Sequence, residues 1–105
     1  MITKAKKANC YRVTIEEMNS VHIPGETLQF EFQDREDLFK IIEHLKQGSG
    51  LEESTATKVG IALRLLGPVM MANHKHALFV DFMPHFKAFM HSLKNTVKNS
   101  TKVNR

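Results

Sequence analysis

The chain has 105 residues, 42% of them hydrophobic and 25% charged, and its formal net charge is +4. This size and balance are typical of one globular domain and exclude a disordered or fibrous chain. No run of about 18 apolar residues could cross a membrane, and no apolar segment follows the basic N-terminus as in an export signal. The single Cys10 belongs to no CxxC pair, so we expect a cytoplasmic protein.

The positive charge is concentrated at the two ends of the chain. Residues 4–7 hold three lysines, and residues 94–105 hold three lysines and an arginine. Residues 10–93, in contrast, carry eight Lys and Arg against eleven Asp and Glu. A nucleic-acid-binding domain usually carries its basic residues on the folded face that follows the phosphates. We therefore do not expect a nucleic-acid-binding domain, and we keep weak, salt-sensitive binding of nucleic acid through the basic ends as an alternative.

Two alternating segments predict a two-stranded antiparallel ribbon. Apolar and polar residues alternate over residues 11–16 and again over residues 28–33. Between them, Pro24-Gly25 favours a tight turn, because proline presets the first central φ and glycine accepts the positive φ that follows. Each strand would have one polar and one apolar face. The predicted apolar faces consist of Tyr11, Val13, Ile15, Leu28, Phe30 and Phe32.

A first helix is predicted directly after the second strand. Asp34 is a good N-cap, and apolar residues recur with helical period from Leu38 to Leu45. We expect this helix to end before Gly48, with the glycine in the left-handed conformation that is common just after a helix C-terminus.

The second helix, capped by Ser54 or Thr55, carries two unusual residues. Glycine in mid-helix costs about 1 kcal/mol relative to alanine, so we expect a neighbouring element, the third helix, to approach closely at Gly60. Pro68 lacks the amide hydrogen that a helix interior needs, so the helix must bend or break there. Because the apolar period continues beyond Pro68, we expect a bend.

A stripe of Phe and Met residues between positions 78 and 93 predicts the third helix and most of the core, after a turn at residues 73–76. Pro84 interrupts the stripe, so the element is either one kinked helix or a short helical turn followed by a longer helix. The order of two strands and three helices predicts an α+β fold, with helices two and three kinked or broken at Pro68 and Pro84. We expect a single domain over residues 10–98, a flexible basic extension at residues 1–9 and a frayed polar tail at residues 99–105.

Four residues on either side of the start of the third helix are the candidates for a metal or ligand site: His74, His76, Asp81 and His85. A zinc site needs three or four such side chains to converge. Their spacing alone does not bring them together, because His74 and His76 lie in a predicted turn and only Asp81 and His85 could meet on one helical face. We therefore predict no catalytic residues and no cofactor. A small-ligand or metal site between helices two and three remains an alternative.

The chain resembles a small bacterial family of cytoplasmic proteins known as a domain of unknown function. The resemblance covers most of residues 11–94, and the first nine residues and the tail after Lys94 look like additions to it. It implies a compact α+β domain without an assigned reaction, and so no functional residues. It rests on four segments, of which the last is the most specific: YRVTIEEM, LQFEFQDREDLFKIIEHL, VGIALRLLGPVMM and HKHALFVDFMPHFKAFMHSLK.

The chain is expected to act through protein contacts and not as an enzyme, because no catalytic constellation is present in the sequence. A two-stranded ribbon leaves strand edges exposed, and the apolar content is generous for this length. Both features favour a protein partner, with a second copy of the chain among the candidates.

Overall fold

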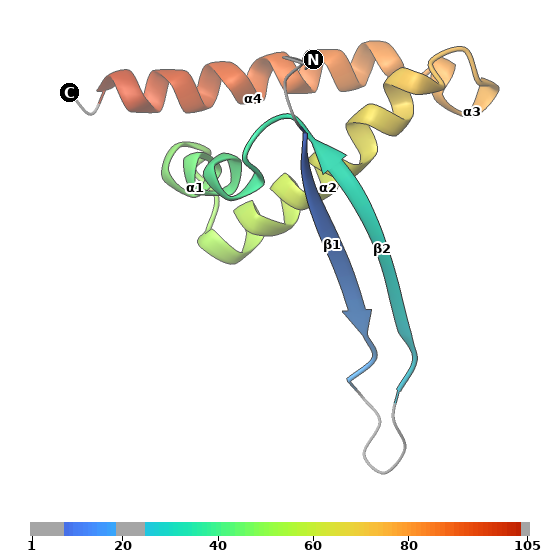
Figure 1. Ribbon diagram of the computed structural model, residues 1–105. Coiled ribbons are helices and arrows are strands. Elements are labelled where there is room, and N and C mark those ends of the chain that lie inside the picture. The colour runs from blue at the N-terminus through green and yellow to red at the C-terminus, as the bar shows by residue number, and fades with distance from the viewer. Residues whose placement is uncertain (1–7, 19–24, 104–105) are drawn as a thin grey trace, which may run out of the picture. The chain divides into compact units, whose positions relative to one another are not determined.

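The computed structural model describes the backbone of residues 8–18 and 25–103 (Figure 1). This part of the chain forms two compact units that divide after residue 37, and each is described by itself. Two strands come first, followed by three long helices and one of four residues, so the predicted α+β fold is confirmed. No helix within the described ranges is long and apolar enough to cross a membrane.

The first unit is an antiparallel ribbon of β1 (Asn9–Glu16) and β2 (Thr27–Asp34). The register pairs the two predicted apolar faces with each other along the whole ribbon. On the opposite face, the guanidinium of Arg12 lies 2.8 Å from the carboxylate of Glu31, its cross-strand partner. The predicted Pro24-Gly25 turn falls mainly on residues 19–24, which lie outside the described residues.

Asp34 ends β2 and does not cap a helix. Its Oδ1 accepts a hydrogen bond of 3.0 Å from the backbone N–H of Glu36, and this bond closes an Asx turn. The first helix of the second unit, α1 (Leu38–Gly48), begins four residues beyond Asp34 and has no acid in its first turn. The prediction of Asp34 as N-cap is therefore wrong. An aspartate accepts from a nearby backbone N–H equally well in an Asx turn and in a helix cap, which is why sequence alone did not separate the two.

The C-terminus of α1 also differs from the prediction. Gly48 is the last helical residue and is buried, and the left-handed conformation belongs to Gly50, with φ of +84°. A Cβ added at Gly48 would lie 3.1 Å from both Cα and Cγ1 of Val97. The backbone conformation of Gly48 does not call for glycine, and the close approach of α1 to the last helix leaves little room for a side chain there.

The second helix, α2 (Glu53–Ala72), starts before both predicted caps. Glu52 occupies the N-cap position without a side-chain capping bond, and its carboxylate accepts a hydrogen bond of 3.1 Å from the hydroxyl of Thr55. Neither Ser54 nor Thr55 is therefore the cap. Pro68 lies inside α2, and the helix continues on both sides of it, as the uninterrupted apolar period predicts.

Gly60 marks the close approach of a neighbouring helix, but the neighbour is α1. A Cβ added at Gly60 would collide with Cδ1 of Ile42 and would lie 2.9 Å from Cδ1 of Leu45. The prediction of a tight contact at this glycine is confirmed, and the assignment of that contact to the third helix is wrong.

The predicted third helix consists of two helices, α3 (Ala77–Val80) and α4 (Met83–Val103). This is the second of the two predicted arrangements, a short helical turn and then a longer helix. Pro84 lies in the first turn of α4, where its missing N–H leaves no helical bond unmade. The first bond of the helix joins the N–H of Phe86 to the carbonyl of Phe82 at 2.9 Å. The helix continues five residues beyond position 98, where the predicted domain ends.

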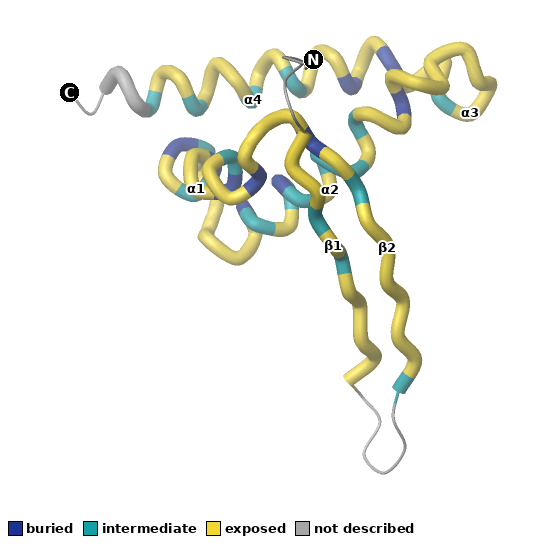
Figure 2. Tube along the Cα trace, in the orientation of Figure 1, coloured by how far each residue is buried: buried dark blue, intermediate teal, exposed yellow. Residues whose placement is uncertain are grey.

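The buried residues of the helical unit lie along α1, in the first half of α2, and where α2 leads through α3 into α4 (Figure 2). At the second place, Met70, Met83 and Phe86 form a cluster against which Leu63, Phe79 and Met90 pack. The Phe and Met stripe is therefore core on one side only, because Phe82 and Phe89 are each about half exposed.

Candidate functional site

Two of the predicted site residues, His74 and His76, form hydrogen bonds with backbone groups at the ends of helices. His74 lies after α2, and its Nδ1–H donates a hydrogen bond of 3.0 Å to the carbonyl of Met71. His76 is the N-cap of α3, and its Nδ1 accepts a hydrogen bond of 3.0 Å from the backbone N–H of Leu78. Each imidazole thus satisfies a backbone group that a helix end leaves without an intrahelical partner. These bonds give both residues a structural role.

The other two candidates, Asp81 and His85, do not join the first two. Asp81 occupies the C-cap position of α3, His85 is exposed on α4, and no hydrogen bond joins their side chains. Over residues 8–18 and 25–103, no three His, Cys, Asp or Glu side chains form a group that could hold a metal ion. A hollow does lie beside the turn, but His74 is the only one of the four candidates that lines it. The other lining residues are Met71, Val80, Met83, Pro84 and Lys87.

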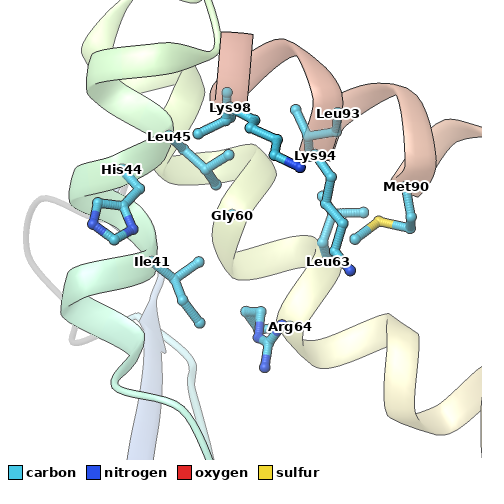
Figure 3. Close-up of a pocket in the computed structure, with 11 residues that line it drawn as sticks. Ile41, His44, Leu45, Gly60, Leu63, Arg64, Met90, Leu93, Lys94 and Lys98 are labelled. Atoms are coloured by element: carbon cyan, nitrogen blue, oxygen red, sulfur yellow. The ribbon is translucent and has the colours of Figure 1, made fainter. Parts of the chain in front are cut away.

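A different cavity, of about 350 Å³, lies between α1, α2 and α4 (Figure 3). Helical periodicity explains most of its apolar lining, because α1 and α4 contribute apolar side chains three, four or seven positions apart on one face. The six apolar side chains that line it are Ile41 and Leu45 from α1, Leu63 from α2, and Met90, Leu93 and Val97 from α4.

The polar lining of this cavity is entirely basic. His44 comes from α1, Arg64 from α2, and Lys94 and Lys98 from α4, and no acidic residue lines the cavity. Figure 3 shows Lys94 and Lys98 reaching from α4 into the space beside α2. Neither lysine forms an ion pair with an acid in the described part of the chain. The cavity therefore has an apolar interior and basic side chains at its edge.

Sequence reasoning missed this cavity, although a signal for it was present. Composition alone assigns Lys94 and Lys98 to the basic C-terminal end of the chain. Val97, however, continues the apolar stripe of the last helix by one more turn, at four residues past Leu93. Lysines that flank such a position lie beside an apolar face and not in a solvated tail.

The ribbon presents a second candidate surface, the outer edge of β2. The N–H of Glu17 donates to the carbonyl of Glu26 at 2.9 Å, so Glu16 and Thr27 form a non-hydrogen-bonded pair in the ladder. Hydrogen-bonded and non-hydrogen-bonded pairs alternate along an antiparallel ladder. The backbone N–H and C=O groups of Thr27 and of every second residue after it in β2 therefore point away from β1. Among the described residues, no third strand pairs with either edge of the ribbon. The residues of β2 whose backbone groups point away from β1 are Thr27, Gln29, Glu31 and Gln33.

Half of the apolar face of the ribbon is also open to solvent, at the end where β1 finishes and β2 begins. Ile15 and Leu28, which face each other across the strands, are 55% and 56% exposed, and Phe30 is 38% exposed. Open strand edges and exposed apolar faces are features through which protein chains commonly associate, so this surface is a candidate interaction site.

Comparison with known proteins identifies a family and a solved structure. Residues 9–95 match DUF3861, described as a domain of unknown function with a solved structure. A crystal structure of a protein of unknown function (eca1910) from Pectobacterium atrosepticum SCRI1043 is similar over 85% of this chain and 99% of that one. The sequence identity is 37% and the TM-score is 0.75. Among curated proteins, none matches the chain.

Proposed function

Because the chain belongs to the DUF3861 family, to which no activity is assigned, we propose its function from its own surfaces. It is a protein-interaction domain and not an enzyme, and it associates with a second copy of itself through the outer edge of β2. The observation that carries this proposal is an eight-residue edge strand beside an apolar face that is more than half exposed at Ile15 and Leu28.

A two-stranded ribbon is at best marginally stable in water, and at least three strands or a packed helix are needed to stabilise it. Pairing β2 with β2 of a second copy gives a four-stranded sheet. The contact is isologous, so it closes with two copies and does not continue into a fibre. The apolar faces of the two ribbons become one continuous surface.

The sequence of β2 favours one register for this contact. With Phe30 opposite the same residue of the second copy, Leu28 faces Phe32 and Gln29 faces Glu31. The aromatic and aliphatic pairs each contribute roughly 0.2–1 kcal/mol, and no like charges lie opposite each other. A register centred on Glu31 would instead place two carboxylates together. The favoured register also aligns the outward N–H and C=O groups of the two edges for hydrogen bonding.

Proline substitution at two cross-strand partners tests this proposal, because Gln29 and Thr14 face each other and both direct their N–H groups outward. Proline at such a position removes no bond within the ribbon. In the dimer, Gln29→Pro removes two hydrogen bonds, one per copy, each contributing about 0.5–1.5 kcal/mol. We expect it to raise the dimer dissociation constant roughly 10–100-fold in sedimentation equilibrium. Thr14→Pro, on the β1 edge, is the matched control and is expected to leave the constant unchanged.

A second pair of variants changes only charge. Gln29→Glu places a carboxylate opposite Glu31 of the second copy and is expected to weaken the dimer, whereas Gln29→Lys is expected to strengthen it, with both effects reduced by salt. A wild-type chain that sediments as a monomer at the highest attainable concentration would overturn the proposal. So would a dimer that tolerates Gln29→Pro but dissociates with Thr14→Pro.

A further inference from the structure

We propose that the cavity between α1, α2 and α4 binds an aliphatic carboxylate of about ten carbons, with the alkyl chain inside the cavity and the carboxylate at Lys94 and Lys98. This inference is independent of self-association, because every residue that lines the cavity belongs to the helical unit and none to the ribbon.

The sign of the ligand charge follows from the lining. Lys94 and Lys98 are four residues apart on α4, and like charges at this spacing repel each other and destabilise a helix slightly. No acidic residue lines the cavity to neutralise them. The whole helical segment from residue 38 onward is basic as well, with ten Lys and Arg against four Asp and Glu. The surrounding potential thus attracts an anion, and two ammonium groups offer a carboxylate charge-assisted hydrogen bonds.

The apolar part of the ligand follows from the interior. Six of the lining side chains are apolar, and they come from all three helices. A free inorganic anion would leave these walls in contact with water, whereas an alkyl chain would cover them and gain the free energy of apolar burial.

The length of the ligand follows from the volume. A cavity of about 350 Å³ is near the lower limit of small-molecule sites. A group of the size of a water molecule occupies about 30 Å³ in a liquid, so the cavity has room for roughly eleven or twelve such groups. Decanoate, with twelve non-hydrogen atoms including the carboxylate, is of about this size, and its shorter homologues would cover less of the apolar walls.

The direct test is calorimetric titration of the full chain with sodium hexanoate, octanoate and decanoate, each kept below its micelle concentration. We expect affinity to rise about fourfold for each methylene that enters the cavity. Decyltrimethylammonium, with the same chain length and the opposite charge, is expected not to bind. An equal affinity for this cation, or no dependence on chain length, would overturn the proposal.

Charge reversal at Lys94 and Lys98 tests whether decanoate binds in this cavity. Lys94→Glu combined with Lys98→Glu is expected to weaken decanoate binding about tenfold or more, because charge-assisted hydrogen bonds are lost and replaced by repulsion. Lys75→Glu combined with Lys87→Glu is the matched control, since it changes the net charge by the same amount at exposed positions outside this cavity. Equal weakening by this control would show a general effect of net charge and not a site. Failure of decanoate to bind, together with a change of sedimentation in the Lys94 and Lys98 double variant, would identify a second copy of the chain as the occupant and overturn the proposal.

Discussion

Replacement of Phe86 by alanine is expected to lower the free energy of unfolding by about 3–5 kcal/mol, the range for large aromatic residues in a packed core. Phe86 is only 7% exposed and belongs to the cluster formed with Met70 and Met83. Its ring also approaches the backbone of α2, because a Cβ added at Gly67 would lie 3.7 Å from its Cζ. Its loss would leave a void bounded by α2 and α4 that these helices can fill only partly.

Urea denaturation followed by circular dichroism measures this loss. Phe89→Ala is the matched control, because it removes the same side chain from the same helix at a position that is 48% exposed. Phe89→Ala is expected to lower the free energy of unfolding clearly less than Phe86→Ala does, since only part of the phenyl surface is buried at position 89. Similar losses for the two variants would mean that the exposed side of the Phe and Met stripe is buried in solution. The stripe would then be core on both sides.

The elements of the fold could be predicted because each has a simple period. Alternation over residues 11–16 and 28–33 identifies the strands, and the register then pairs the two apolar faces. The helical period survives at both Pro68 and Pro84, yet only the first lies inside a continuous helix. A period shows which side chains share a face but not whether the backbone hydrogen bonds continue through a proline.

The ends of the elements could not be predicted as well, because one side chain suits several local structures. Asp34 accepts from a backbone N–H in an Asx turn with the same chemistry that would cap a helix. Gly48 matches the pattern of a helix C-terminus, but what distinguishes its place in the structure is its close contact with Val97, nearly fifty residues away. Such a contact is a tertiary property, and no local pattern contains it.

The candidate site shows the same limit. Histidine is a common metal ligand, and this chemistry makes His74 and His76 candidates in the sequence. In the structure both side chains instead form hydrogen bonds with backbone groups at helix termini. The cavity needs three helices at once, and its basic rim comes from lysines that composition assigns to a solvated end. The sequence could have shown that Val97, beside these lysines, continues the apolar stripe. It could not have shown that side chains of α1 and α2 line the same cavity.

Gly60 gives the sharpest test of how α1 and α2 pack. Gly60→Val is expected to destabilise the fold by about 1–3 kcal/mol, the usual cost of overpacking, because the buried side chains of Ile42 and Leu45 must move to make room. The Cβ alone would collide with Cδ1 of Ile42 and lie 2.9 Å from Cδ1 of Leu45, and valine adds two methyl groups to that Cβ. The better helix propensity of valine offsets only a few tenths of a kcal/mol. Ala62→Val, at an exposed position of the same helix, is the control and is expected to cost less than about 1 kcal/mol.

A double-mutant cycle separates this clash from a general weakening of α2. Ile42→Val removes the Cδ1 atom that a side chain at position 60 would strike, and by itself it is expected to cost about 0.5–1.5 kcal/mol. In that background Gly60→Val should cost less, with a favourable coupling of roughly 0.5–3 kcal/mol in chemical denaturation. Ile42→Val should not change the cost of Ala62→Val, which lies on the exposed side of α2. Strict additivity of Gly60→Val and Ile42→Val would mean that the glycine is not required by α1, and that the close packing of these two helices does not determine the residue at position 60.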